Sequence, residues 1–395
     1  MRVIHVITRL ILGGAQENTV LCCEELRQRF GDDVLLVTGP PLGPEGSLLA
    51  RAQAAGLPTE IVPALRREIH PWRDAAAYFA LRRIIRRFRP DVVHTHSAKA
   101  GILGRIAAWR LDVPAVIHTV HGAPFHPYQV APARWFSIAC ERYAARRCHA
   151  LIGVADAMID LLVDAGVADR DKCVTIYSGM EIEPFLRADE RRAAVRRELG
   201  YSDEHCVIGK IARLFHLKGH RDVIAMARRL IPRNPQVRFL WVGDGILRSG
   251  LEREIAEAGL TPYFRLTGLV DPSRLPDLLG AMDILVHASL REGLARVLPQ
   301  ALLAGKPVVS YDVDGAREVC LNDQTGFLVP ARDVEALTKA VQRLIDSPEL
   351  RQRLGRAGQG RCSQLFSHRT MTEQIRALYC RVLEESGRGS PPGSS

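Results

Sequence analysis

Short apolar segments alternate with longer amphipathic segments over most of this chain. The apolar segments are continuous runs rich in Val and Ile, without the period-two alternation of a half-exposed strand. Such runs are typical of parallel strands that are covered by helices on both faces. In the first half of the chain we expect strands at residues 3–8, 34–38, 59–62, 91–95, 115–119, 150–154 and 174–177.

A non-periodic stretch, residues 178–185, separates this series from a second one. The second series predicts strands at residues 206–212, 237–242, 264–267, 284–287, 307–310 and 326–329, again with helices between them. A chain of 395 residues that is 47% hydrophobic is long enough for two cores of about 150 to 200 residues each. We therefore expect two α/β domains.

The expected domain limits are residues 1–180 and 181–370. A final helix, residues 371–386, carries an apolar face that must pack against another part of the protein. That face consists of Ile375, Leu378, Tyr379, Val382 and Leu383. Residues 387–395 are Gly, Ser and Pro with one Arg, cannot bury an apolar face, and are expected to be a disordered tail.

Targeting and redox features favour a cytoplasmic protein. The start, M-R-V-I-H-V-I-T, predicts a strand and lacks the pattern of a signal peptide. No run of about 18 apolar residues predicts a membrane-spanning helix. The nine cysteines are scattered without a C-x-x-C pair, as expected of reduced thiols, and no cluster of ligands predicts a zinc site.

The net charge of +10 is concentrated in residues 60–150, which hold 15 Lys or Arg and only six Asp or Glu. The densest part, residues 78–89, predicts a helix with an apolar side and an arginine-rich side. A solvated helix face is one interpretation, and contact with an anionic membrane or lipid phosphate is another. Nucleic acid is the weakest interpretation, because no known nucleic-acid-binding motif accompanies the arginines of this helix.

The most informative stretch is residues 289–310, S-L-R-E-G-L-A-R-V-L-P-Q-A-L-L-A-G-K-P-V-V-S. It predicts a strand end, a loop with Glu292 and Gly293, an apolar helix and a new buried strand. Gln300 follows Glu292 by eight residues, so both side chains are expected along one side of the same helical element. The backbone amides of residues 294–297, at the mouth of that helix, favour an anion such as phosphate.

Three glycine- or cation-bearing loops follow predicted strands. Arg213 and Lys218 flank the turn in K-I-A-R-L-F-H-L-K-G-H, and two cations at a strand end suit a diphosphate, although surface cations are also common. The G-D-G loop at 243–245 and the pair Gly13 and Gly14 allow close approach of a ligand to the backbone. The G-D-G loop is equally compatible with an ordinary tight turn, and for Gly13 and Gly14 taken alone a tight turn is the favoured interpretation.

Histidines mark two neighbouring strand ends in the first domain. His94 and His96 end one strand, and His118 and His121 lie at the end of the next. His121 is the best candidate for a polar contact to a substrate hydroxyl, because it precedes Gly122 in a loop outside the strand pattern. The H-x-H spacing at 94 and 96 suggests a metal, but no nearby Asp, Glu or Cys completes a ligand set.

Together these motifs resemble the family 4 glycosyltransferases, which have the GT-B fold. The resemblance covers the chain apart from the tail, and its motifs are the Gly13-Gly14 loop, H-T-H-S at 94–97, H-G at 121–122, I-A-R-L-F-H-L-K-G at 211–219, G-D-G at 243–245 and E-G-L-A-R-V-L-P-Q-A-L-L-A-G-K-P-V-V at 292–309. It implies two Rossmann-like domains that face one another across a cleft, with the last helix crossing back to the first domain.

The resemblance also implies an activity. That activity is retaining transfer of a sugar from a nucleotide donor, with UDP-sugars favoured, and without a cofactor or required metal. No protein nucleophile is implied, since same-face attack assisted by the leaving phosphate is the family's favoured mechanism.

Site residues carry over by motif. Glu292 would bind the donor sugar's hydroxyls, His121 would approach that sugar from the opposite wall, and Arg213 with Lys218 would neutralise the diphosphate. The remaining donor-binding positions would be Gly14, Gly293, Leu294, Ala295, Gln300, Gly268 and Leu269, the last two beside the base. Gln300 replaces a glutamate of the family motif, so ribose binding would persist in an uncharged form.

We therefore expect a transferase for a cell-envelope glycan or glycolipid, with a glycan or lipid-linked acceptor and no nucleic-acid partner. The basic region, residues 60–150, would bind the acceptor, and helices near Arg82 and Arg142 would rest on the anionic inner face of the plasma membrane. Two alternatives stay open, namely a nucleotide-sugar epimerase of GT-B architecture and a nucleotide-sugar-binding protein with weak turnover.

Overall fold

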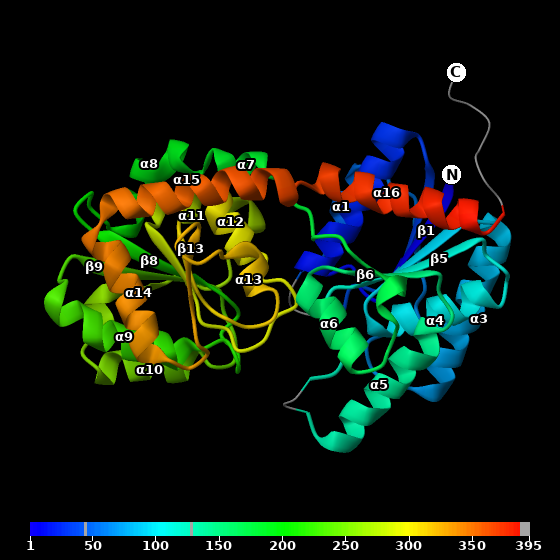
Figure 1. Ribbon diagram of the computed structural model, residues 1–395, viewed down its shortest axis with the longest axis horizontal. Helices are drawn as coiled ribbons and strands as arrows, with labels where there is room; N and C mark the ends of the chain where they lie inside the picture. The colour runs from blue at the N-terminus through cyan, green and yellow to red at the C-terminus, as the bar shows by residue number, and fades with distance from the viewer. Residues whose placement is uncertain (43–45, 127–128, 388–395) are drawn as a thin grey trace. The chain divides into compact units, whose positions relative to one another are not determined.

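The computed structural model describes residues 1–42, 46–126 and 129–387 of the chain (Figure 1). The chain forms two compact units. The first unit contains Met1–Met180 and the segment from His368 onward, and the second contains Glu181–Ser367. The disordered tail expected at residues 387–395 lies outside the described residues except for Gly387.

The first unit is built on a fully parallel sheet of seven strands in the order β3-β2-β1-β4-β5-β6-β7. All seven strands predicted for the first half exist, each within two residues of its predicted limits. They are β1 (Arg2–Ile7), β2 (Asp33–Thr38), β3 (Thr59–Ile61), β4 (Val92–His96), β5 (Ala115–Val120), β6 (Ala150–Gly153) and β7 (Cys173–Thr175).

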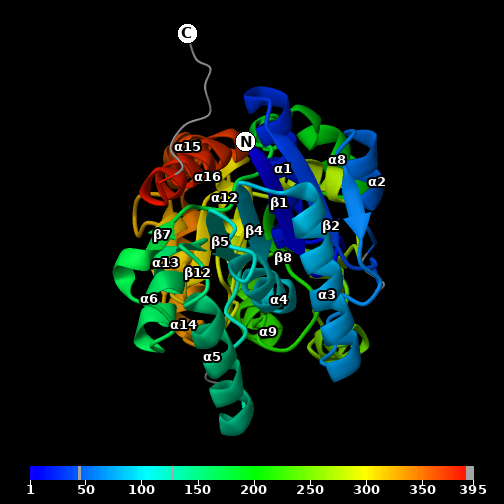
Figure 2. The ribbon, with the colours of Figure 1, turned by 90° about the vertical axis from the view of Figure 1, so that its right-hand side faces the viewer.

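Helices cover both faces of this sheet (Figures 1 and 2). They are α1 (Gly14–Phe30), α2 (Leu49–Ala54), α3 (Pro71–Phe88), α4 (Ala98–Trp109), α5 (Ala131–Ala145), α6 (Asp156–Asp164) and α16 (His368–Glu385). On one face α4 packs between α3 and α5. On the other, α16 lies beside α1, and Tyr379 is buried in a core that includes Val3 and Ile117. The last helix thus belongs to the first unit, and it begins three residues before the predicted Met371.

The second unit has a six-stranded parallel sheet in the order β10-β9-β8-β11-β12-β13. Its six predicted strands also exist. They are β8 (Cys206–Ile211), β9 (Val237–Val242), β10 (Phe264–Leu266), β11 (Ile284–His287), β12 (Val308–Tyr311) and β13 (Gly326–Val329).

Helices again form a layer on each face of the second sheet (Figure 1). The helices are α7 (Glu183–Leu186), α8 (Arg192–Leu199), α9 (His220–Leu230), α10 (Arg248–Glu257), α11 (Leu275–Ala281), α12 (Val297–Leu303), α13 (Ala316–Val319), α14 (Val334–Asp346) and α15 (Pro348–Leu365). Helices α9, α10 and α14 form one layer, while α11, α12 and α15 form the other.

Strand order identifies where each unit is expected to bind a ligand. In the first sheet the order changes direction between β1 and β4, and in the second sheet it changes between β8 and β11. In open parallel sheets, ligands bind outside the carboxyl ends of the strands at such a switch point. The loops that follow β8 and β11 are therefore the natural candidates in the second unit.

Candidate active site

The loop after β8 packs against the end of β11. The carbonyl of Leu217 accepts hydrogen bonds from the Leu290 amide at 2.8 Å and from the Ser289 hydroxyl at 3.2 Å. Gly219 has a φ of +62°, and a Cβ at this position would lie 1.9 Å from the carbonyl oxygen of Ala288. Only glycine fits there without displacing backbone. This contact fixes the neighbouring Lys218 at the carboxyl end of β11.

Lys218 and Glu292, predicted separately from two motifs, form an ion pair in the structure. The Glu292 backbone amide donates to Asp314 Oδ2 at 2.6 Å, which holds the segment from the loop after β12. His287 Nε2 lies 3.5 Å from the same Glu292 oxygen. The two partners of the ion pair are 20% and 23% exposed, so a ligand can still reach them.

The carboxylate of Glu292 is held ionised. Burial alone would raise its pKa, but His287 and Lys218 beside it together hold the pKa well below the usual range. Burial lowers the pKa of His287, so this ring is neutral near pH 7 and contributes a polar contact, while Lys218 supplies the positive charge. An ionised carboxylate is a hydrogen-bond acceptor only, which suits it to sugar hydroxyls.

Lys210 is a further candidate for this site, and none of the motifs named above includes it as a site residue. It lies on β8, is buried, and donates from Nζ to the Lys218 carbonyl at 2.7 Å. Burial, aided by the nearby Lys218, lowers the pKa of Lys210 to about 7. A cation inside the continuous apolar run C-V-I-G-K-I is the sequence signal that indicates it, because charged residues are rarely buried without a partner.

Arg213 lies on the same loop, and its side chain is exposed. Its guanidinium carbon is 5.1 Å from the centroid of the Phe215 ring, a cation–π contact that restrains the side chain. Within the part of the chain that the structure describes, Arg213 makes no ion pair. The loop thus carries two cations: Lys218 is paired with Glu292, and Arg213 has no acidic partner among the described residues.

The loop after β9 contacts both the loop after β8 and the loop after β10. A Cβ on Gly243 would lie 2.1 Å from the Ala212 carbonyl oxygen, so the G-D-G turn is in close backbone contact with the β8 loop. The Gly243 amide donates to the Gly268 carbonyl at 3.0 Å. Leu269, expected beside a base, is 72% exposed. Gly268 and Leu269 therefore lie at the same sheet edge as the β8 loop.

The amides of residues 294–297 were expected to form the first turn of the apolar helix, but α12 begins at Val297, the last of these residues. The expectation that Glu292 and Gln300 lie on one helical element is wrong, because Glu292 precedes α12 by five residues. The reason is tertiary: Gly315 donates to the Gly293 carbonyl at 3.3 Å, and with the Asp314 contact this keeps the backbone out of the helix.

The segment before α12 still offers backbone hydrogen-bond donors. Among the described residues, the backbone amides of Leu294 and Ala295 have no hydrogen-bond partner. Gln300 lies on α12, is half-buried, and its side-chain amide has no partner in the described ranges. Because α12 has only seven residues, its macrodipole adds little, and the individual amides are the relevant groups.

In the first unit, Gly14 is the first residue of α1 and His121 follows β5 directly. His121 Nε2 is 3.1 Å from His96 Nδ1. His5 on β1 joins His94 and His96 in a buried set whose ring nitrogens lie within 4.8 Å of one another. No nearby Asp, Glu or Cys in the sequence completes a ligand set with the H-x-H pair. His5 was overlooked because only the pairing of β1 with β4 brings it there.

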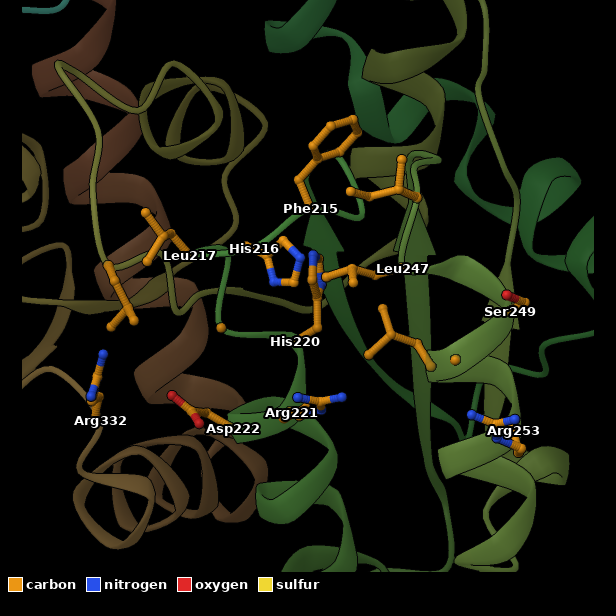
Figure 3. Close-up of a pocket in the computed structure, with 15 residues that line it drawn as sticks. Phe215, His216, Leu217, His220, Arg221, Asp222, Leu247, Ser249, Arg253 and Arg332 are labelled. Atoms are coloured by element: carbon orange, nitrogen blue, oxygen red, sulfur yellow. The ribbon is translucent and has the colours of Figure 1, made fainter. Parts of the chain in front are cut away.

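A cavity of about 580 Å³ lies beside α9 and α10 (Figure 3). Phe215, His216 and Leu217 line it, so it adjoins the β8 loop. Arg213, Lys218 and the other predicted site residues do not line it. The cavity is thus separate from the Lys218–Glu292 pair.

Two family models match the chain, and together they cover most of it. The model described as glycosyl transferase 4-like domain matches residues 13–179, and that described as glycosyl transferases group 1 matches residues 191–361. The chain belongs to the GT4-type glycosyltransferases. Within the described residues of this glycosyltransferase, no helix is both long and apolar enough to span a bilayer.

Curated relatives are also glycosyltransferases. The UDP-Gal:alpha-D-GlcNAc-diphosphoundecaprenol alpha-1,3-galactosyltransferase of Escherichia coli is 29% identical over 291 residues, covering 73% of this chain and 75% of that protein. The 2-deoxystreptamine N-acetyl-D-glucosaminyltransferase of Streptomyces fradiae is 28% identical over 366 residues, covering 86% and 84%.

Solved structures show the fold of this glycosyltransferase. HepE from Anabaena, crystallised in complex with UDP, matches with a TM-score of 0.82 at 21% identity, covering 96% of this chain and 99% of that one. A glycosyltransferase from Rickettsia africae matches with a TM-score of 0.81 at 19% identity, covering 97% and 99%. The chain therefore has the GT-B fold, with two Rossmann-like parallel-sheet units.

Proposed function

We propose that this glycosyltransferase moves a sugar from a UDP-sugar to a glycan or lipid-linked acceptor in the synthesis of a cell-envelope polysaccharide or glycolipid. The observation that carries the proposal is the ionised Glu292 beside Lys218 and the Arg213 loop at the switch point of the second sheet. A carboxylate next to cations suits a ligand that joins hydroxyl groups to a diphosphate.

The relatives support this donor and acceptor. The name of the Escherichia coli protein specifies UDP-Gal as donor and a diphosphoundecaprenol-linked sugar as acceptor. HepE was crystallised with UDP and with UDP-glucose. Both point to a uridine nucleotide as the first donor class to test.

In the proposed reaction, Arg213 and Lys218 bind the diphosphate and stabilise the charge that develops on it as the sugar leaves. Lys210 supports this role because its Nζ donates a hydrogen bond to the Lys218 carbonyl. The amides of Leu294 and Ala295 add hydrogen bonds to the donor. With two cations on one loop, the leaving group is neutralised without a metal ion.

Glu292 orients the donor sugar through its hydroxyls, and His121 makes a polar contact to a substrate hydroxyl. We propose retention of the anomeric configuration, with the acceptor attacking the face from which the diphosphate leaves. In this mechanism the leaving phosphate takes the acceptor's proton, so no protein nucleophile is required. The bond between the sugar and the diphosphate breaks, the bond between the sugar and the acceptor forms, and the acceptor's proton goes to the leaving phosphate.

The first unit carries a surface that suits a membrane-linked acceptor. Trp72 and Phe79 on α3 are 82% and 62% exposed, and Trp135 and Phe136 on α5 are 71% and 54% exposed. Helices α3 and α5 flank α4 on the same face of the sheet (Figure 2). Amphipathic aromatic rings and cations are enriched where proteins meet the lipid interface.

The cations of this surface are mainly on α3. Arg83, Arg86 and Arg87 are exposed, while Leu81 and Ile85 are buried, as the pattern predicted. Arg142, also expected to face lipid, instead donates to the Gly166 carbonyl at 2.7 Å and to the Ala165 carbonyl at 3.0 Å, where it caps α6. We propose that the α3 arginines and the aromatic side chains hold the protein at the anionic inner face of the plasma membrane.

The deciding experiment measures nucleotide release from a panel of UDP-, GDP- and ADP-sugars with lipid extracts as acceptor, with and without EDTA. Release of UDP and a glycosylated lipid, unaffected by EDTA, is the expected result. Binding of UDP without release would favour the binding-protein alternative. A changed sugar still attached to UDP would favour the epimerase alternative. Inversion of the new linkage, seen by NMR of the product, would refute retention.

A further inference from the structure

Beneath His121, the first unit contains a continuous chain of buried hydrogen bonds. His5 Nδ1 lies 3.0 Å from His96 Nε2, and His96 Nδ1 lies 3.1 Å from His121 Nε2. At the other end, the Tyr379 hydroxyl of α16 lies 3.3 Å from His5 Nε2 and 2.5 Å from His94 Nδ1. His94 Nε2 lies 2.7 Å from the Thr119 hydroxyl, which ends the chain.

The sheet dictates this arrangement. His5 and His94 are register partners on β1 and β4, and His96 is the partner of Thr119 on β5. Alternation along each strand places these side chains on the face that α16 covers. Tyr379 is fully buried in the core on that face. The chain thus links the last helix of the protein to the carboxyl end of β5.

The groups of this chain are uncharged. Burial lowers the pKa of His5 to about 3 and lowers the pKa of His94 and His96 well below the usual value. Burial likewise raises the pKa of the Tyr379 hydroxyl. A neutral imidazole has one donor and one acceptor nitrogen, so each ring must donate at one nitrogen and accept at the other.

This requirement couples the tautomers. Each pair of neighbours shares one hydrogen, so all donors of the chain point either toward His121 or away from it. In one direction Tyr379 donates to His5, and His121 accepts at Nε2 and therefore carries its proton on Nδ1. In the other direction His121 donates from Nε2. A ring nitrogen left without its partner in this interior would cost about 1 to 3 kcal/mol, so mixed arrangements are disfavoured.

We propose that Tyr379, His5 and His96 are positioning residues that fix the tautomer and ring orientation of His121. The inference rests on the proposed contact between His121 and a substrate hydroxyl, and it gives the last helix of the chain a role within the first unit. His121 touches substrate in this scheme, whereas the three positioning residues act only through it.

A metal ion held by His5, His94 and His96 is the competing interpretation of the same set. Every ring nitrogen of these residues already has a hydrogen-bond partner among the described residues. The His5–His96 separation of 3.0 Å fits a hydrogen bond. The set contains no carboxylate or thiolate to offset an ion's charge in a fully buried position.

The test is Tyr379→Phe in the full-length protein, with Tyr311→Phe as the matched control. Tyr311 is also fully buried and donates its hydroxyl hydrogen to Asp222 at 2.8 Å, but it lies in the second unit. The readouts are the 15N shifts of the histidine ring nitrogens, with His121 identified by His121→Ala, and steady-state kinetics with a UDP-sugar.

In the wild type and in Tyr311→Phe, His121 should show a single tautomer. In Tyr379→Phe it should become a mixture, and kcat/KM should fall about tenfold, the size of one lost hydrogen bond. A His121 tautomer and rate unchanged by Tyr379→Phe would overturn the proposal. So would zinc or another divalent ion found bound stoichiometrically by elemental analysis and lost on His5→Phe.

The two proposals can fail separately. If His121→Ala retains full transfer activity, the proposed role of His121 is wrong, but the NMR result still decides whether the chain controls its tautomer. His5→Gln, which keeps one donor and one acceptor, should restore part of the activity that His5→Phe loses. Equal activity of these two variants would also overturn the positioning role.

Discussion

Lys218 and Glu292, 74 positions apart in the chain, form an ion pair at the carboxyl end of β11. Each came from a different motif, and the pair exists because the Leu217 carbonyl bonds the backbone that follows β11. In the proposed reaction the Glu292 carboxylate binds the hydroxyls of the donor sugar, and the Lys218 ammonium binds the diphosphate.

Glu292→Ala should reduce sugar transfer by at least about a hundredfold, the size of losing an interaction made in the transition state. UDP affinity should change much less, because Arg213 and Lys218 remain. Initial rates and calorimetric UDP titration measure the two effects. Glu335→Gln is the control, since it breaks an exposed ion pair with Lys339 in the same unit. Full activity of Glu292→Ala would show that the site is elsewhere.

Gly219→Ala should destabilise the second unit and weaken UDP binding together. Alanine meets both a φ of +62° and a Cβ contact of 1.9 Å with backbone, so the Lys218 loop must move. Gly200→Ala is the matched control, because its φ is +76° with nothing within 4 Å. The control should cost about 1 to 2 kcal/mol on unfolding and Gly219→Ala more. Equal costs would mean that the packing against Ala288 is unimportant.

Gln300→Glu should maintain or strengthen UDP affinity. The side-chain amide of Gln300 has no partner in the described residues, so an added carboxylate is not forced against an existing contact. A charge-assisted hydrogen bond to a ribose hydroxyl is about twice as strong as a neutral one. Titration with UDP and with 2′-deoxy-UDP separates this from a general charge effect. Equal gains for both ligands would contradict ribose contact at this position.

Lys210 should make stability depend on pH above neutrality. Its pKa is lowered from 10.5 to about 7, so between these values the unfolded chain binds a proton that the folded chain has released. The free energy of unfolding should therefore rise with pH over this window, by up to about 1.4 kcal/mol per pH unit from this group.

Lys210→Met should flatten that rise, as measured by urea unfolding at pH 7, 8 and 9. Lys339→Met is the control. Glu335 raises the pKa of this exposed lysine from its usual 10.5, so Lys339 stays protonated in both the folded and the unfolded chain between pH 7 and 9. Its contribution is therefore constant over this window, and removing it does not flatten the rise. A slope unchanged in Lys210→Met would show that Lys210 stays protonated in the folded protein.

Trp135→Ala should weaken binding to vesicles that contain anionic lipid. The Trp135 ring is 71% exposed on α5, so its removal takes away surface that would enter the lipid interface without opening a core. Trp109→Ala is the control, because Trp109 is the last residue of α4, lies beside the His149 ring and is 40% exposed. Co-sedimentation at two salt concentrations measures both. Equal loss in the two variants would contradict a localised membrane surface.

The architecture could be predicted from the amino-acid sequence, because the signals that specify it are local. Continuous Val and Ile runs specify buried parallel strands, and the apolar face of residues 375–383 required a docking partner. Glu292, Lys218 and Arg213 could be proposed as site residues for the same reason, since each lies in a short motif next to a predicted strand end.

Which of these residues contact one another depends on long-range packing in the folded chain. Helix α12 starts at Val297, later than predicted, because Asp314 and Gly315 form hydrogen bonds with the preceding backbone. A helical pattern in the sequence carries no information about that contact. His5 and Lys210 were missed because each is a single polar residue inside an apolar strand, and its neighbours are set by strand order. Pairing across β1, β4 and β5 and packing against α16 are long-range events, so no local pattern contains them.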